Sequence, residues 1–331
     1  MPWNLAASLI CIYPQESFAT LNTVVSPGSA MASDSFLHLA RGPLRLRLAP
    51  ARGGGIASFD CCAVSGGKIP IFRPADEAAK SPVALASFPL VPFVNRVRGG
   101  TFDFRGRTVT LERNLLPDPS PLHGQGWLAS WSVERAAEDG AVLAFRHDPD
   151  EWPWAYEARQ VFALDETGLT LDLTCTNRSP EPMPCGLGQH PYFPCNSQTR
   201  IDTVVDSVWE IDEQVLPVAK LPAAGRYDLS DRPVCGQGLD HGFGGWRGRA
   251  IITDPGLPFR IEMSSPDARF FQLYSPVSGG IFVAEPVTHA NAALNEPEGS
   301  WQELGLRVLE PGESMSLTMR VEVMPDPSPR T

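Results

Sequence analysis

Residues 168–177 read GLTLDLTCTN and residues 313–323 read ESMSLTMRVEV, and in both stretches apolar and polar side chains alternate. Successive side chains of a β-strand point to opposite faces, so this period of two is typical of a strand with one buried face. The alternation puts Leu169 and Leu171 on one face of the first stretch and Met315 on one face of the second. Both stretches therefore predict strands of an antiparallel sheet.

The same alternation extends outward over most of the chain. It appears in PLRLRL (43–48), in TFDFRGRTVTL (101–111) and in WSVERAAEDGAVLAF (131–145), and the last two contain turn residues that predict β-hairpins. A helical pattern is suggested only in ADEAAKSPVALA (75–86), where Pro82 interrupts it. We find no repeat and no linker, so we expect one large all-β domain.

Composition supports this fold class and excludes several kinds of protein. The chain has 331 residues, of which 43% are hydrophobic, which excludes a disordered chain. Its 33 prolines are about twice the usual share, which short strands joined by turns tolerate better than long helices do. With 27 Lys and Arg against 38 Asp and Glu, the net charge of −11 argues against binding to nucleic acid or to an anionic membrane surface.

The two ends of the chain differ from the rest. Residues 1–33 lack the alternation, and we interpret them as a disordered or mis-assigned extension with Met31 as a possible true start; a weak export signal is the alternative. Residues 34–326 would form a single domain and residues 327–331 a tail. No window has the apolar length of a membrane helix, so we expect a cytoplasmic protein.

The cysteines predict neither disulfides nor a metal site. Their number is odd and no CxxC pair occurs, so we expect reduced thiols. Cys185, His190 and Cys195 have a symmetric spacing that resembles a zinc site, but no fourth ligand follows at a usual distance. The seven cysteines are Cys11, Cys61, Cys62, Cys175, Cys185, Cys195 and Cys235.

Three ionisable residues stand in apolar or glycine-rich surroundings, where burial without a partner is costly. His190 lies in CGLGQHPYFP, where a core histidine and a catalytic one are equally consistent. His123 precedes a Gly-x-Gly in PLHGQGW, which lets the backbone approach another group closely. Glu285 follows the apolar run IFVA, which predicts a buried strand ending at a carboxylate with a raised pKa, as a general base needs; a salt-bridged glutamate is the alternative.

Three further polar residues complete the set of candidates. Asn95 and Arg96 follow an apolar segment in FVNRVRGG, and Asp240 lies in GLDHGF, which predicts a turn. The glycine-rich nucleotide-binding motifs and the GxSxG of hydrolases are absent from the sequence.

Taken in order, these motifs resemble those of the aldose 1-epimerases, or galactose mutarotase-like proteins, over roughly residues 40–325. The chain departs from the family in that His123 is followed by Gly-Gln-Gly, and that prolines follow His190 and Glu285. The segments that carry the resemblance are GGGIASF (53–59), VNRVRGGTFDFRGRTVTLERN (94–114), LHGQGW (122–127), GQHPYFP (188–194), LDHGF (239–243), AEPVTHANAALN (284–295) and LEPGESMSLTMRVEV (309–323).

The resemblance implies a β-supersandwich of large twisted antiparallel sheets, with a sugar in a cleft on one concave face. It implies that Glu285 is the general base and His190 the general acid. It also implies a set of sugar-binding residues, namely Arg96, His123, Asp240 and Asn95.

The implied chemistry suits these residue types. Interconversion of anomers requires a proton to leave O1 while another reaches the ring oxygen, so we expect an acid and a base on opposite sides of a small ring, with no cofactor and no metal. Aromatic rings could cover the sugar's C–H groups, and the candidates are Tyr192, Phe193, Trp127 and Trp152. The expected partner is a small-molecule sugar, bound by a monomer or homodimer.

Three other functions are consistent with the same residues. A hexose-6-phosphate epimerase on this fold would need a basic cluster for the phosphate, with Arg98 near Arg96 as a candidate. A glycoside hydrolase or lyase would need a carboxylate pair, for which Asp240 and Glu285 are available. A non-catalytic carbohydrate-binding protein would bind sugar without turnover.

Overall fold

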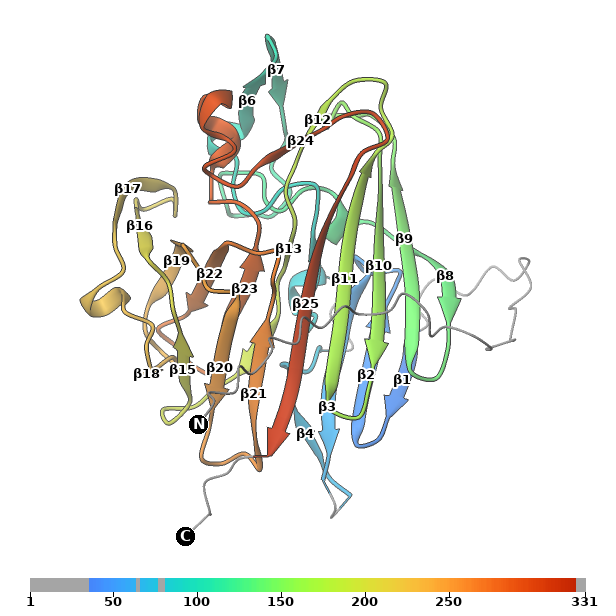
Figure 1. The fold of residues 1–331 in the computed structure, drawn as a ribbon, viewed down its shortest axis with the longest axis vertical. Coiled ribbons are helices and arrows are strands. Elements are labelled where there is room, and N and C mark those ends of the chain that lie inside the picture. The colour runs from blue at the N-terminus through green and yellow to red at the C-terminus, as the bar shows by residue number, and fades with distance from the viewer. Residues whose placement is uncertain (1–35, 64–65, 77–80, 326–331) are drawn as a thin grey trace, which may run out of the picture. The chain divides into compact units, whose positions relative to one another are not determined.

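The computed structural model describes residues 36–63, 66–76 and 81–325, which belong to one unit of the chain (Figure 1). The predicted extension (1–33) lies outside these residues, and so does the predicted tail (327–331). The described residues form strands, loops and short 3-10 turns, and every strand pair is antiparallel. The predicted all-β class is therefore confirmed.

A nine-stranded sheet contains both of the alternating stretches, residues 168–177 as one strand and residues 314–323 within another. Leu169 and Leu171 pair with Val321 and Met319, and these side chains share one buried face. From edge to edge the strands are β18 (Arg232–Pro233), β15 (Arg200–Thr203), β20 (Arg249–Thr253), β21 (Phe259–Ser264), β25 (Ser314–Pro325), β11 (Gly168–Asn177), β10 (Tyr156–Leu164), β9 (Gly140–His147) and β8 (Ser132–Ala136).

An eight-stranded sheet carries two of the six candidate residues, Asp240 and Glu285, in its strands. Its order is β17 (Pro217–Pro222), β16 (Ser207–Ile211), β19 (Leu239–Gly244), β22 (Phe270–Ser275), β23 (Ile281–Val287), β13 (Gly188–Gln189) and β5 (Pro89–Leu90), and β14 (Tyr192–Pro194) also pairs with β23.

Smaller elements surround the two large sheets. The predicted hairpin 101–111 forms β6 (Thr101–Phe104) and β7 (Arg107–Thr110). A four-stranded sheet comprises β1 (Leu37–Arg41), β2 (Leu44–Ala49), β3 (Gly55–Cys62) and β4 (Lys68–Pro70), and β12 (Met183–Cys185) pairs with β24 (Arg307–Leu309). The 3-10 turns are η1 (Pro82–Ala84), η2 (Arg98–Gly100), η3 (Gly126–Leu128), η4 (Gly225–Tyr227), η5 (Ala293–Asn295) and η6 (Glu298–Ser300).

The expected helical pattern at 75–86 does not produce an α-helix in its described part. Only η1 forms there, at the proline that was expected to interrupt the pattern.

Alternation along the strands of the eight-stranded sheet separates its two faces. In β22, Phe271 and Leu273 join the main core, which also contains Leu171 and Leu317 of the nine-stranded sheet. The alternate residues of β22, Phe270 and Tyr274, point to the other face, where Phe270 belongs to a second, smaller apolar cluster. One face thus packs in the sandwich core, and the opposite face, which we call the site face, is available for polar groups.

The expectation of reduced cysteines is wrong for one pair. Cys195 and Cys235 form a disulfide, with their Cα atoms 5.7 Å apart across 40 residues of sequence. Cys195 follows β14 and Cys235 precedes β19, and only the sheet pairing brings these two segments together. The other cysteines within the described residues, Cys61, Cys62, Cys175 and Cys185, are free.

None of the helices in the part of the chain that the structure describes has the length and apolarity needed to cross a membrane.

Candidate active site

All six candidate residues line one pocket on the site face, with a volume of about 350 Å³. They are Asn95, Arg96, His123, His190, Asp240 and Glu285. Residues separated by almost 200 positions in the chain therefore meet at one cavity, as the resemblance implied.

Strand register puts His190 opposite Glu285. Tyr192 of β14 pairs with Val283 of β23. In an antiparallel pair the same register places His190, two positions before Tyr192, opposite Glu285, two positions after Val283. Pro191 has no N–H to donate, and the pairing with β23 is interrupted between β13 and β14. His190 stands in this interruption.

Register also brings Asp240 to the same face. Glu285 pairs with Gln272 of β22, and Asp240 pairs with Tyr274 of the same strand. Two expectations are corrected here. Glu285 does not end its strand, because β23 continues to Val287, and Asp240 lies inside β19 rather than in a turn.

Glu285 and His190 form a buried pair. Oε1 of Glu285 lies 3.5 Å from Nε2 of His190, and the histidine ring stacks on Phe88 with a centroid distance of 4.4 Å. The two groups thus lie side by side rather than on opposite sides of a ring-sized space. This still suits the chemistry, because O1 and the ring oxygen of an aldose are bonded to the same carbon.

Burial favours the neutral form of both members of this pair. It raises the pKa of Glu285 well above its usual value, and the negative charge of Asp240 adds to this while Arg96 opposes it. Burial lowers the pKa of His190 to about 3. Oε2 of Glu285 has no hydrogen-bond partner among the described residues. Because buried polar atoms are normally hydrogen-bonded, this oxygen can accept a hydrogen bond from a bound ligand.

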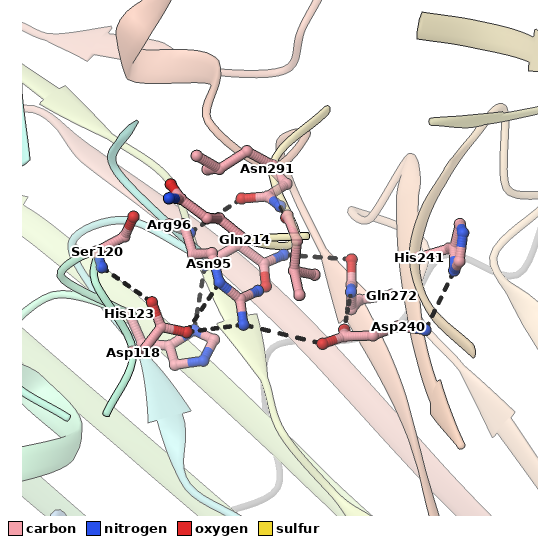
Figure 2. A network of polar contacts seen from close by, with 12 residues as sticks. Asn95, Arg96, Asp118, Ser120, His123, Gln214, Asp240, His241, Gln272 and Asn291 are labelled. Atoms are coloured by element: carbon pink, nitrogen blue, oxygen red, sulfur yellow. Dashed lines mark hydrogen bonds and ion pairs between the residues drawn. The ribbon is translucent and has the colours of Figure 1, made fainter. Parts of the chain in front are cut away.

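Arg96 lies between two carboxylates (Figure 2). Its Nε donates to Oδ2 of Asp118 at 3.0 Å. Its Nη2 forms ion pairs with Oδ2 of Asp118 at 2.9 Å and with Oδ2 of Asp240 at 3.8 Å. Gln272 donates to Oδ1 of Asp240 at 2.8 Å. Burial raises the pKa of Asp240, and the charge of Arg96 opposes this.

His123 is held by the backbone of the neighbouring segment. The N–H of Asn95 donates to Nδ1 of His123 at 3.1 Å, so the neutral ring carries its proton on Nε2. Burial lowers the pKa of His123 well below its usual value, and the nearby His190 and Arg96 lower it further. His123 is therefore a neutral N–H donor at the pocket.

The expected close approach at the glycines after His123 is present. Gly124 has a φ of +71°, and a methyl group there would lie 2.2 Å from the carbonyl oxygen of Val91. At Gly126 it would lie 2.3 Å from the Val91 side chain. These positions require glycine because the segment after β5 packs directly on them.

Sequence reasoning missed four polar residues at or beside the pocket. Asp118 lies in a proline-rich loop, and Asn291 accepts from the N–H of Arg96 at 3.0 Å. Gln272 and Tyr274 look like ordinary residues of an apolar strand in the sequence. Only their register opposite Glu285 and Asp240 could have indicated them.

Two of the four aromatic residues expected near the sugar lie at the pocket. Trp127 and Tyr192 line the pocket. Phe193 and Trp152 are buried in the main core instead.

No group of metal-binding side chains occurs within residues 36–63, 66–76 and 81–325. Cys195, one of the three residues with zinc-like spacing, is bonded to Cys235.

Comparisons with known proteins agree with the fold. The family model for aldose 1-epimerase matches residues 52–322. The uncharacterised protein YphB of Escherichia coli K12 is 34% identical over 265 residues, which cover 77% of this chain and 89% of YphB. The crystal structure of a putative aldose 1-epimerase from E. coli K12 superposes with a TM-score of 0.81 at 31% identity, covering 88% of this chain and 99% of the other. A galactose mutarotase-like protein from Clostridium acetobutylicum has a TM-score of 0.76 at 18% identity, covering 87% of this chain and 95% of the other, and shows the likeness in fold alone.

Proposed function

Because the chain belongs to the aldose 1-epimerase family, we propose that it interconverts the α and β anomers of a free aldose by general acid/base catalysis. The observation that supports this most directly is the buried pair of Glu285 and His190. Both groups can transfer protons and both line the pocket. Their proximity matches a reaction in which O1 loses a proton and the ring oxygen, on the same carbon, gains one.

In the proposed reaction Glu285 removes the proton from O1 and His190 delivers one to the ring oxygen. Burial places the shared proton on Glu285 when the pocket is empty. A sugar hydroxyl that donates to the unpartnered Oε2 would stabilise the carboxylate, and the proton then moves to His190 across the 3.5 Å contact. The pair carries one proton in both arrangements, so no outside proton is needed.

The remaining candidates would hold the sugar. The Nε2–H of His123 would donate near the ring oxygen. Arg96, Asp240 and Asn95 would bind hydroxyls, and Gln272 would keep Asp240 in place. The ring opens, the C1–C2 bond rotates and the reverse transfers close the ring on the other face, with the sugar retained throughout.

Polarimetry tests the proposal directly. Freshly dissolved α-D-glucose or α-D-galactose should reach anomeric equilibrium faster with the protein than without it. The variants Glu285→Gln and His190→Asn should each lower kcat by about 10²-fold or more, the usual contribution of one positioned acid or base. Sugar binding should persist, because Arg96 and Asp240 remain.

Both variants must melt near the wild-type temperature for this comparison to count. Glu285→Gln should melt no lower than wild type at neutral pH. A glutamate whose pKa is raised in the folded state contributes its full stability below the unfolded pKa, and this contribution is lost as the pH rises through the folded pKa. Near-normal turnover in a folded Glu285→Gln variant would exclude this glutamate as the base. Sugar binding by wild type without any faster anomeric equilibration would instead favour a non-catalytic sugar-binding protein.

The main catalytic alternative is an epimerase acting on hexose 6-phosphates. Against it, Arg98 does not line the pocket, and its Nη2 donates instead to the carbonyl of Pro217 at 2.9 Å. Comparing glucose with glucose 6-phosphate at equal concentration decides between the two, and a strong preference for the phosphate would overturn the free-aldose proposal.

A further inference from the structure

Among the residues that line the pocket, carboxyl groups outnumber positively charged side chains. Arg96 supplies the one positive charge among the lining residues, against the carboxyl groups of Asp118, Asp240 and Glu285. The two lining histidines are neutral at pH 7, because burial lowers the pKa of each. Even with Glu285 protonated, two carboxylates oppose one guanidinium.

Asp118 occupies the edge of Arg96 that an anion would need. A guanidinium binds a carboxylate or phosphate best with two parallel N–H donors. In this protein Nε donates to Oδ2 of Asp118 at 3.0 Å, and Nη2 forms an ion pair with the same oxygen at 2.9 Å. Asp118 is itself fixed, since its Oδ1 accepts from the N–H of Ser120 at 2.9 Å and its side chain is only 16% exposed.

We propose that Asp118 is a specificity-determining residue that restricts the pocket to uncharged sugars, by neutralising Arg96 and repelling substrates with a carboxylate or phosphate group. The inference rests on the proposed function in that the ligand is a sugar. An anionic sugar would have to displace Asp118 from Arg96 and would meet Asp240 within reach of the same guanidinium. A neutral sugar meets neither obstacle, because the N–H groups that Asp118 leaves unused can donate to hydroxyls.

The test compares D-glucose with D-glucuronate, which differ by a carboxylate at C6. Polarimetry gives kcat/KM above the uncatalysed rate of each sugar, and isothermal titration calorimetry gives both dissociation constants. Wild type should prefer glucose in both measurements. Asp118→Asn should shift the glucose-to-glucuronate ratio toward glucuronate by about 10-fold or more, because a like charge is removed from the site.

Two further variants separate charge from structure. Asn retains an oxygen that can accept from Ser120, so Asp118→Asn should melt near wild type. Asp118→Glu, which keeps the charge, should preserve most of the discrimination. Asp148→Asn removes the same charge from an exposed residue outside the pocket and should leave the ratio unchanged.

The outcomes distinguish this inference from the proposed function. An unchanged ratio in folded Asp118→Asn would overturn the role of Asp118, and so would equal affinity of wild type for both sugars or binding of neither. Binding that discriminates as expected, without turnover of any aldose, would overturn the epimerase proposal and leave the role of Asp118 intact.

Discussion

At the scale of single residues, Glu285 and His190 are best treated as one titrating unit. Oε1 of Glu285 and Nε2 of His190 are 3.5 Å apart, and the two side chains are only 3% and 12% exposed, so adding or removing a proton at one affects the other. Burial alone would leave the pair with a protonated carboxyl and a neutral imidazole. The form with one proton is also the form that the proposed reaction uses.

This arrangement predicts an unusual pH profile. The pair gains a second proton only below the lowered pKa of His190, about 3, and loses its single proton only above the raised pKa of Glu285. The value of kcat/KM, which reports the free enzyme, should therefore show no loss on the acidic side near the ordinary histidine pKa of about 6.5, and should fall on the alkaline side as Glu285 loses its proton. Initial rates by polarimetry after brief exposure to each pH measure this.

The control for this profile is His38, which lies outside the pocket. His38→Gln should leave the profile unchanged. A loss of activity as the pH falls below about 6.5 in wild type would mean that His190 titrates like an exposed histidine, and would contradict the lowered pKa of His190.

At the scale of elements, the site depends on a loop pressed against a sheet. His123 has a φ of +60° and Asn95 a φ of +55°, so both residues that carry the Asn95–His123 contact adopt the left-handed conformation. The N–H of His123 also donates to the carbonyl of Asn95, at 3.0 Å. These paired segments hold His123 and Arg96 over the strands that carry Glu285 and Asp240.

Substituting Gly124 should disturb this contact specifically. Alanine at Gly124 would be strained by the positive φ and would also collide with the Val91 carbonyl oxygen. We expect Gly124→Ala to lower kcat/KM by about 10- to 100-fold, since displacing a site residue by about 1 Å can cost 10²-fold. Thermal melting should show a loss of stability as well.

Gly106 provides the matched control. Its φ of +79° imposes the same backbone strain, but a methyl group there would meet no atom within 4 Å. Gly106→Ala should therefore lose only the stability due to strain and keep its kcat/KM. Equal activities of the two variants would show that the packing on Val91 does not position the site.

At the scale of the molecule, the Cys195–Cys235 disulfide lies where the chain passes between the two large sheets. Cys195 connects β14 of the eight-stranded sheet to β15 of the nine-stranded sheet, and Cys235 connects β18 back to β19. The segment containing His190 and the strand containing Asp240 are thereby linked. We propose that residues 34–326 act as a single domain with this crosslink inside it.

Reduction of the disulfide should destabilise the protein. A crosslink spanning 40 residues restricts the unfolded chain, and the loop-entropy relation gives about 4 kcal/mol of unfolding free energy. Denaturation by urea with and without a thiol reductant measures the difference. The double variant Cys195→Ser/Cys235→Ser should have the stability of reduced wild type, with and without the reductant. Identical curves for wild type with and without reductant would show that the crosslink does not contribute.

The strands and their buried faces could be predicted from the sequence, because the alternation of apolar and polar side chains is visible within each strand. Leu169, Leu171 and Met315 could be assigned to a buried face without knowledge of their neighbours, and the hairpin at 101–111 could be predicted from its own residues. The resemblance to a family indicated the six residues that were found at one pocket. Each of them stands in a motif that can be recognised along the chain.

Tertiary structure alone decided which residues face one another. Gln272 meets Glu285 through strand register, Asp118 meets Arg96 through a loop contact, and Cys195 meets Cys235 across 40 residues. None of these pairs has a spacing that a local pattern could reveal. Strand register, loop packing and disulfide pairing depend on interactions between segments that are distant in the sequence. They can therefore be assigned only from the three-dimensional structure.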